Sequence, residues 1–304
     1  MTSTLDRPVK VTVFQGVSMR RKVTNNVATV LVTLAVLIAL VPLLWVLYSV
    51  ITKGIKAITS PVWFTHSQAG MTAFQVGGGV YHAIIGTLLQ GLVCAIISIP
   101  VGIFVAIYLV EYGGGTRLGK LTTFMVDILT GVPSIVAALF IYALWVATLG
   151  FQRSGFAVSL ALVLLMIPVI VRATEEMLRI VPMDLREASY ALGVPKWKTI
   201  ARIVIPTALS GIVTGIMLAL ARVMGETAPL LILVGYSQAM NFDMFNGFMG
   251  SLPGMMYDQT SAGAGANPVP TDRLWGAALT LILLIAILNI GARYVAKIFA
   301  PKKV

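Results

Sequence analysis

Residues 82–110 read HAIIGTLLQGLVCAIISIPVGIFVAIYLV, a run without a single Asp, Glu, Lys or Arg. A membrane-spanning helix needs about 20 such residues, because the apolar core of a bilayer is about 30 Å thick and each helical residue advances about 1.5 Å. Comparable apolar runs occupy residues 27–51, 121–149, 156–171, 210–234 and 274–292. The sequence therefore predicts an all-α fold, a polytopic membrane helix bundle with six transmembrane helices.

The composition agrees with a membrane protein and excludes several other classes. Of the 304 residues, 58% are hydrophobic and 11% are charged, whereas soluble domains carry about 25% charged residues. The net charge of +11 is spread over too little polar surface to suggest a nucleic-acid-binding protein. A single cysteine, Cys94, excludes a disulfide within the chain, and two histidines are too few for a metal site of their own.

The distribution of Lys and Arg predicts the orientation of the helices. Of the 22 Lys and Arg residues, seventeen lie before the first span, in 111–120, in 172–209 or after the last span. Four, namely Lys53, Lys56, Arg153 and Arg273, lie in the segments on the other side. Because cytoplasmic loops carry the excess of positive charge, we expect both termini to lie in the cytoplasm.

This topology divides the chain into a bundle with two long loops. We expect a cytoplasmic basic tail at 1–26, an additional first transmembrane helix at 27–51, an external loop at 52–81, a core at 82–298 and a cytoplasmic C-terminus at 299–304. Within the core, loop 172–209 faces the cytoplasm and is charged. Loop 236–273 faces outward, either as a contact for an external partner or exit gate, or as a partly ordered connector.

The cytoplasmic loop contains PMDLREASYALGVPKWKTIARIVIP at 182–206, which predicts a short helix of about ten residues. We expect Asp184 to cap it with Glu187 at the third position, and Gly193 to end it in the left-handed conformation. The small residues Ala188, Ser189 and Ala191 leave its surface free of bulk. Such a helix between two membrane spans suits a contact with a soluble partner.

The same residues resemble the EAA loop of ABC importer membrane subunits, which reads Glu-Ala-Ala, three residues, Gly, nine residues, Ile-x-Leu-Pro. The matching positions are Glu187, Ala188, Gly193, Ile203 and Pro206, with Ser189 and Ile205 as mild departures. In that family the loop forms the coupling helix that enters a cleft of a cytoplasmic ATPase. The resemblance implies the type I ABC importer (MetI-like) permease fold, with Glu187, Ala188 and Gly193 as the residues that couple to the ATPase.

A charged pair lies inside the run 210–234. An Arg at the centre of a span costs about 2.5–3.5 kcal/mol, so Arg222 is expected to face protein, water or a bound anion. Glu226 follows four residues later, which on one continuous helix places it within reach of an ion pair, and Thr227 adds a hydroxyl. The guanidinium can hold a tetrahedral oxyanion, with Glu226 balancing its charge; alternatively, the pair only locks helix packing.

Two motifs are similar to the permeases of phosphate ABC importers. These are Arg-x-x-Gly-Glu-Thr-Ala-Pro-Leu at 222–230, whose ending looks like the PstA type, and Gly-Val-Pro-Ser-Ile at 131–135. The resemblance covers about 82–298 and implies a phosphate pathway that includes Arg222, Glu226 and Thr227. The residues alone leave open an importer of sulfate or molybdate, a gradient-driven secondary transporter, or a scaffold.

The resemblance also implies partners and a location. The partners are a homologous PstC-type permease, two copies of a cytoplasmic ABC ATPase and an extracytoplasmic phosphate-binding protein, in a bacterial or archaeal cytoplasmic membrane. The chain's own near-Walker run, GGTRLGK at 114–120, is followed by Leu121 instead of the Ser or Thr that holds magnesium. We therefore expect a non-catalytic subunit that binds no cofactor, with ATP and magnesium on the partner ATPase.

Overall fold

The computed structural model describes residues 18–299, so positions 1–17 of the predicted tail and residues 300–304 lie outside the described residues. Every regular element of residues 18–299 is helical, as predicted. The elements are α1 (Met19–Ile58), α2 (Tyr81–Ile107), η1 (Tyr108–Tyr112), α3 (Arg117–Thr130), α4 (Ser134–Ile141), η2 (Tyr142–Thr148), α5 (Gly155–Ile180), α6 (Met183–Ala191), α7 (Lys196–Thr199), η3 (Ile200–Val204), α8 (Ile205–Met224), α9 (Ala228–Leu233), α10 (Leu252–Ser261) and α11 (Pro268–Phe299).

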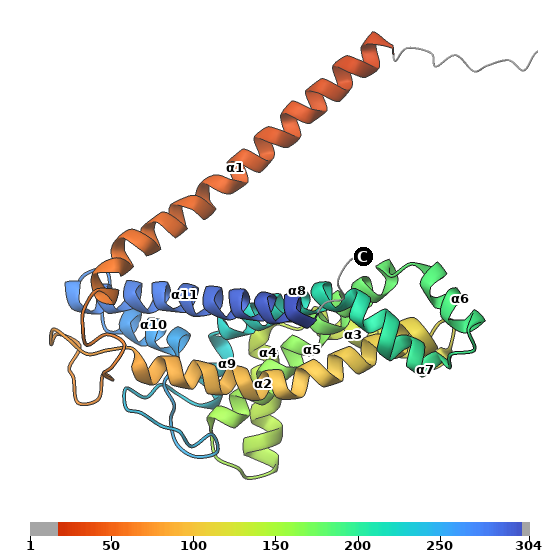
Figure 1. The fold of residues 1–304 in the computed structure, drawn as a ribbon. Coiled ribbons are helices and arrows are strands. Elements are labelled where there is room, and N and C mark those ends of the chain that lie inside the picture. Colours follow the sequence, from red (N-terminus) through yellow and green to blue (C-terminus); the bar gives the residue numbers. More distant parts are fainter. Residues whose placement is uncertain (1–17, 300–304) are drawn as a thin grey trace, which may run out of the picture. The chain divides into compact units, whose positions relative to one another are not determined.

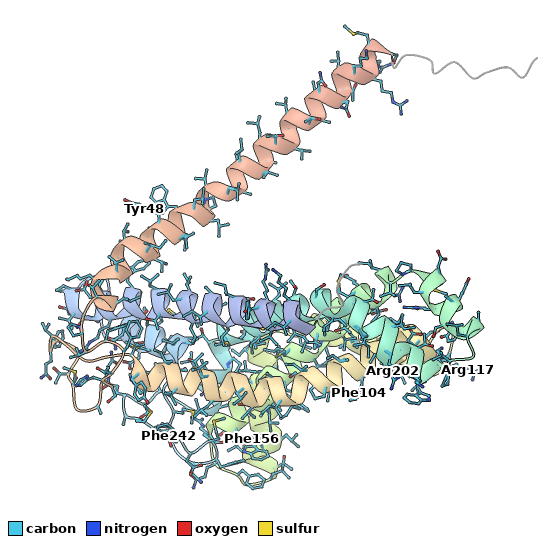
Figure 2. The ribbon with its side chains drawn as sticks, in the orientation of Figure 1. Tyr48, Phe104, Arg117, Phe156, Arg202 and Phe242 are labelled. Carbon is cyan, nitrogen blue, oxygen red and sulfur yellow. The ribbon has the colours of Figure 1, made fainter. Side chains whose placement is uncertain are left out.

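The chain divides into two compact units, Met1–Ser49 and Val50–Val304. In the first unit the structure describes most of α1, whose most apolar 18-residue window has a mean hydropathy of 2.9 and no buried residue. Figure 2 shows its side chains pointing outward all around the helix. A helix that is apolar on every face is suited to lipid or to a protein partner in the membrane.

The second unit is built around α5, which packs against α2, α8, α4 and α3 (Figure 1). In its most apolar window 61% of the residues are buried, and Ala157, Ala161 and Met166 are completely so. The apolar run 156–171 lies within α5, which is longer than the run and extends over Gly155–Ile180. Burial inside the unit explains how α5 keeps Pro168 and polar side chains within a membrane helix.

The predicted span at 121–149 is not one continuous helix. It consists of α3 and the α4–η2 segment, which meet at an angle of 105°. Pro133 lies at the break in an extended conformation, with φ −61° and ψ 140°. Proline has no N–H to continue the α3 hydrogen-bond ladder, so the chain turns there. The described residues thus hold five long apolar helices, or six spans when the bent pair counts as one.

The helices extend beyond the apolar runs into the predicted loops. Helix α5 continues to Ile180 and α8 begins at Ile205, so the connection inside the predicted loop 172–209 is shorter than expected. In the same way α1 extends to Ile58, and loop 236–273 contains α10 and the start of α11. Charged residues at a membrane interface mark the end of the apolar run without ending the helix.

Helices α5 and α8 approach closely at two glycines of α8. A Cβ at Gly211 would lie 2.1 Å from the Met177 sulfur, and one at Gly215 would lie 2.5 Å from the Ala173 Cβ. Small residues let membrane helices come close enough for van der Waals contact between backbones. This contact ties the helix that carries Arg222 to the centre of the bundle.

Candidate functional site

The predicted pathway residues lie where α8 ends. Arg222 is in the last turn of α8, which stops at Met224, and Gly225 closes the turn by donating its N–H to the Arg222 carbonyl. Glu226 and Thr227 occupy the break before α9 begins at Ala228. The Thr227 carbonyl accepts hydrogen bonds from the N–H groups of Leu230 and Leu231, which starts the new helix. Pro229 fits the first turn of α9, because an N–H at this position would have no acceptor within the helix.

The break separates Arg222 from Glu226. On one continuous helix Glu226 would lie within reach of Arg222, but among the ion pairs of residues 18–299 these two side chains do not form one. The Arg222 side chain is exposed on the surface of the chain, whereas Glu226 is half-buried and lines a small internal cavity. The structure therefore leaves the guanidinium of Arg222 accessible to an anion.

Arg222 ends an exposed row of side chains on α8 that is rich in hydroxyl groups. At intervals of three and four residues, which keep them on one helical face, this row consists of Thr207, Ser210, Thr214, Leu218 and Arg222. Beside it, an open groove of about 400 Å³ runs between α5 and α8. Because a charged side chain within a span normally faces protein or water, this face of α8 is suited to a pathway or to a second membrane subunit.

The predicted coupling residues lie together on the outer side of α6 and at its end. Glu187, Ala188 and Gly193 are all exposed. Gly193 has φ +75° with no atom within 4 Å of an added Cβ, so it ends the helix in the left-handed conformation, as predicted. These residues belong to α6 and its end, which lie at the same end of the second unit as α7 (Figure 1).

Two details of the predicted coupling helix were wrong. Asp184 is not its cap, because α6 begins one residue earlier at Met183 and Pro182 precedes it without a side-chain hydrogen bond. Ser189 does not contribute to the outer surface, since it is 4% exposed and its hydroxyl lies 2.8 Å from the Thr199 hydroxyl of α7. The hydroxyl that replaces a methyl group at this EAA position thus joins α6 to α7.

The inner side of α6 is fixed by Arg186. Its Nη1 lies 3.2 Å from Glu111 Oε1, and the two side chains are 9% and 5% exposed. This contact is an ion pair without the alignment of a hydrogen bond, because Glu111 Oε1 has no hydrogen-bond partner among the described residues. Arg186 Nη2 also donates to the Leu178 carbonyl at 2.8 Å. One side chain of α6 therefore contacts both η1, which continues α2, and the end of α5.

Lys196 makes a second connection between α7 and η1. Its ammonium lies 4.7 Å from the centre of the Tyr112 ring and also donates to the Glu111 carbonyl. Together with Arg186, it attaches the α6–α7 segment to the end of α2. Movement of this segment would be transmitted to the membrane helices through these contacts.

Asp127 belongs to a chain of ion pairs between α3 and α5. It pairs with Arg172, whose Nη1 lies 2.8 Å from Glu175, and Glu175 lies 2.6 Å from Arg179. Asp127 therefore contributes to the packing of α3 against α5. The near-Walker run plays a local structural part as well, since Thr116 caps α3 by accepting the Gly119 N–H at 2.9 Å.

Comparison with known proteins identifies the family. The model of the binding-protein-dependent transport system inner membrane component matches residues 98–304, which include α5, α6, the helix break and α11. The chain belongs to this family. It is accordingly a multi-pass membrane protein and one component of a larger transport system.

Relatives and solved structures agree with this family. The chain is 58% identical to the phosphate transport system permease protein PstA of Mycobacterium leprae, over 96% of this chain and 95% of the relative. It is 40% identical to the PstA protein of Pasteurella multocida, over 93% and 96%. A structure of the MetNI methionine ABC transporter is similar in fold, with a TM-score of 0.56 and 19% identity over 73% of this chain and 94% of that one.

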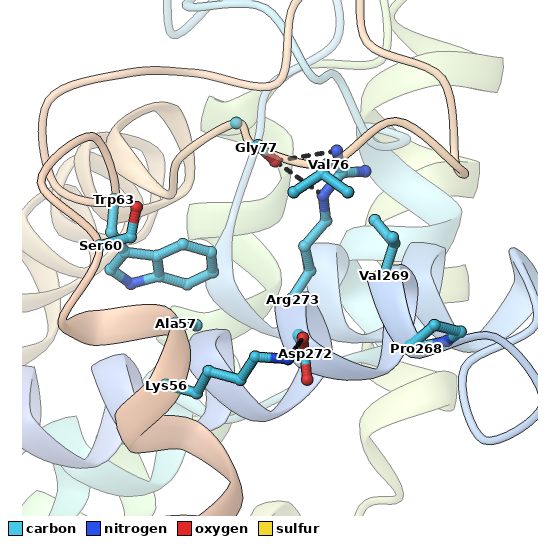
Figure 3. A pocket seen from close by; sticks show the side chains of 11 residues that line it. Lys56, Ala57, Ser60, Trp63, Val76, Gly77, Pro268, Val269, Asp272 and Arg273 are labelled. Atoms are coloured by element: carbon cyan, nitrogen blue, oxygen red, sulfur yellow. Dashed lines mark hydrogen bonds and ion pairs between the residues drawn. The ribbon is translucent and has the colours of Figure 1, made fainter.

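Another cavity lies away from the helix break, next to the loop before α2. It measures about 310 Å³, and Figure 3 shows Lys56 directed at Asp272 and Arg273 directed at the Gly77 carbonyl. The Lys56–Asp272 distance is 2.5 Å, and Arg273 donates to the carbonyls of Thr72, Gln75 and Gly77. Both cations of this cavity are thus already paired, which distinguishes them from Arg222.

The loop that leads to α10 is ordered by its own side chains. Asn246 and the Phe245 N–H donate to the Asp243 carboxylate, and these hydrogen bonds lower the pKa of Asp243. Asn241 donates to the carbonyls of Asn246 and Phe248. In this family member the predicted external loop is therefore a structured segment, and whether it closes an exit remains a prediction.

Sequence reasoning missed the residues that fix α6 and surround Glu226. Arg186 was counted only as a positive charge of the cytoplasmic loop and Glu111 was not considered, although the two side chains lie 3.2 Å apart. Gln90, in the middle of α2, was not singled out, yet it is 3% exposed. The signal that could have found it is a polar amide inside a run of mostly apolar residues.

Proposed function

We propose that this chain is the transmembrane permease subunit of an ATP-driven importer of inorganic phosphate. The observation that carries the proposal is Arg222, an accessible guanidinium at the helix break, within a sequence that relatives named as phosphate transport permeases match over almost their whole length. A planar guanidinium binds tetrahedral oxyanions through two parallel hydrogen bonds. Arg222 is the group that receives phosphate as it crosses the membrane.

Glu226 and Thr227 tune this site. A carboxylate near Arg222 weakens the hold on an anion, and a site in a transport pathway must release what it admits. The unwound segment between α8 and α9 supplies backbone groups and the Thr227 hydroxyl a few residues after Arg222. Broken helices are tolerated within a membrane where they line a pathway or contact other protein.

Transport requires an external source of free energy. Moving a charge against the potential of an inside-negative cell costs about 2.3 kcal/mol per elementary charge and 100 mV. We infer that a separate pair of ABC ATPases supplies it by docking on the outer surface of α6, where Glu187, Ala188 and Gly193 are exposed. The chain itself is non-catalytic in this scheme.

The proposed assembly places α6 in the cytoplasm, together with both termini, in a bacterial or archaeal cytoplasmic membrane. A homologous PstC-type permease covers the face of α8 that carries Arg222, and a phosphate-binding protein docks on the opposite side. Closure of the ATPases moves α6, and Arg186 and Lys196 pass the movement to η1 and α2. The helices then expose Arg222 alternately to the two sides of the membrane.

The test is reconstitution of the chain with these partners in proteoliposomes. We expect ATP-dependent uptake of radiolabelled phosphate that excess sulfate or molybdate does not inhibit. Preferred uptake of sulfate or molybdate would instead identify an importer of another oxyanion. Phosphate uptake by the chain without any ATPase, driven by an ion gradient, would contradict the proposal and indicate a secondary transporter.

A further inference from the structure

The half-buried Glu226 faces a small cavity between four helical segments. The cavity measures about 10 Å³, which is room for about one water molecule. Its walls come from α2, α5, the α8–α9 break and the start of α10, and its polar lining residues are Thr87, Gln90, Glu226 and Ser251. It therefore adjoins the candidate phosphate site without having room for phosphate itself.

Gln90 is the wall residue with an unused donor. Its side chain is 3% exposed, and its Nε2 has no hydrogen-bond partner among the described residues. The Gln90 carbonyl accepts a hydrogen bond from the Ser159 hydroxyl of α5 at 3.1 Å, which fixes the backbone at this point. A buried amide without a partner is unfavourable, so a group that accepts its hydrogens is expected in the cavity.

The two hydroxyls that line the cavity differ in whether their hydrogen is free to be donated. Thr87 Oγ1 accepts the Leu252 N–H and donates to the Ala83 carbonyl, both at 2.8 Å, so its hydrogen is already used. Ser251 Oγ accepts the Gly254 N–H at 3.2 Å, which leaves its hydrogen to be donated. Gln90 and Ser251 thus bring donors to a cavity whose acidic wall residue is Glu226.

We propose that Gln90 is a positioning residue that holds the Glu226 carboxylate in this cavity through one water molecule. A carboxylate held there is kept from pairing with Arg222, whose guanidinium then stays available to phosphate. The inference deepens the proposed function and rests on it. Without the Gln90 donor, Glu226 loses its partner inside the bundle and competes with phosphate for Arg222.

The test compares Gln90→Leu, Glu226→Gln and the double variant in the reconstituted, ATP-driven complex. We expect Gln90→Leu to lower phosphate uptake about tenfold, which corresponds to about 1.4 kcal/mol. In the double variant, uptake should return to the level of Glu226→Gln alone, because a neutral amide at 226 does not compete for Arg222. A structural defect caused by the leucine would not be repaired in this way.

Gln259→Leu is the matched control, since Gln259 is also buried, at 1% exposure, and lies in α10. It should leave uptake close to that of the wild type. Unchanged uptake in Gln90→Leu, or an equal loss in Gln90→Leu and in the double variant, would overturn the inference while leaving the proposed function intact. Absence of phosphate uptake by the wild-type complex would contradict the proposed function, and this inference with it.

Discussion

Arg186 of α6 lies 3.2 Å from Glu111 at the end of η1, and both side chains are almost fully buried. A charge removed from water is tolerated only when it is compensated, so this pair fixes how α6 sits on the membrane helices. The exposed Glu187 is its direct neighbour in sequence. The same short helix therefore has one side that holds the bundle and another that is available to a partner.

Breaking the Arg186–Glu111 pair should be costly. In Arg186→Met, Glu111 becomes a buried charge without compensation, which destabilises by about 3–5 kcal/mol. We expect a lower midpoint of thermal unfolding for the purified complex and a loss of ATP-driven phosphate uptake. The double variant Arg186→Met, Glu111→Leu should be milder than Arg186→Met alone; additive losses would show that the two residues do not interact.

Glu187→Ala should impair the coupling of ATP hydrolysis to transport without destabilising the protein. Because Glu187 is exposed, the substitution should change the free energy of unfolding by less than about 0.5 kcal/mol. Phosphate uptake per ATP hydrolysed should nevertheless fall, because the surface that contacts the ATPase is altered. If the variant takes up as much phosphate per ATP hydrolysed as the wild type, the result would count against docking of the ATPase at α6.

Gly193→Ala should strain the end of α6. At φ +75° an alanine costs about 1–2 kcal/mol, although the added Cβ meets no atom within 4 Å. We expect partly uncoupled ATP hydrolysis, measured against phosphate uptake in proteoliposomes. Gly193→Asn is the control, since asparagine tolerates the left-handed conformation; an equal defect in both variants would refute the conformational explanation.

Gly215→Ala should force α5 and α8 apart, because its Cβ would lie 2.5 Å from the Ala173 Cβ. Overpacking of this kind costs about 1–3 kcal/mol and should lower the unfolding temperature of the protein in detergent. Gly291→Ala in α11, where an added Cβ has no atom within 4 Å, is the matched control. Equal melting temperatures for the two variants would contradict the close approach of α5 and α8.

Much of this fold follows from the length and spacing of apolar runs. These runs located all the long helices, and Gly193 marked the end of α6 correctly because few other residues adopt a positive φ. The extent of α5 was not predictable from hydropathy, since its charged last turns are held by contacts with other helices, such as the Arg172–Asp127 pair.

The choice of Arg222 and Glu226 as pathway residues stays a prediction, and their arrangement was not predictable from the sequence. The spacing of Arg222 and Glu226 suggested that they share one helical face. Instead, α8 ends before Gly225, and α9 begins with Pro229 in its first turn. The partners of Arg186 and the surroundings of Gln90 depend on segments far apart in sequence, which no local pattern reveals.

Phosphate uptake by the Arg222→Gln variant tests the central claim most directly. The variant and the wild type are to be compared in the ATP-driven complex at equal amounts in the membrane, with Arg222→Lys as the control that keeps the charge. Loss of a charged hydrogen-bonding partner costs about 2–5 kcal/mol, so Arg222→Gln should lose more than about 95% of the uptake rate while Arg222→Lys retains part of it. Wild-type uptake by a fully inserted Arg222→Gln complex would contradict the claim that this guanidinium receives phosphate.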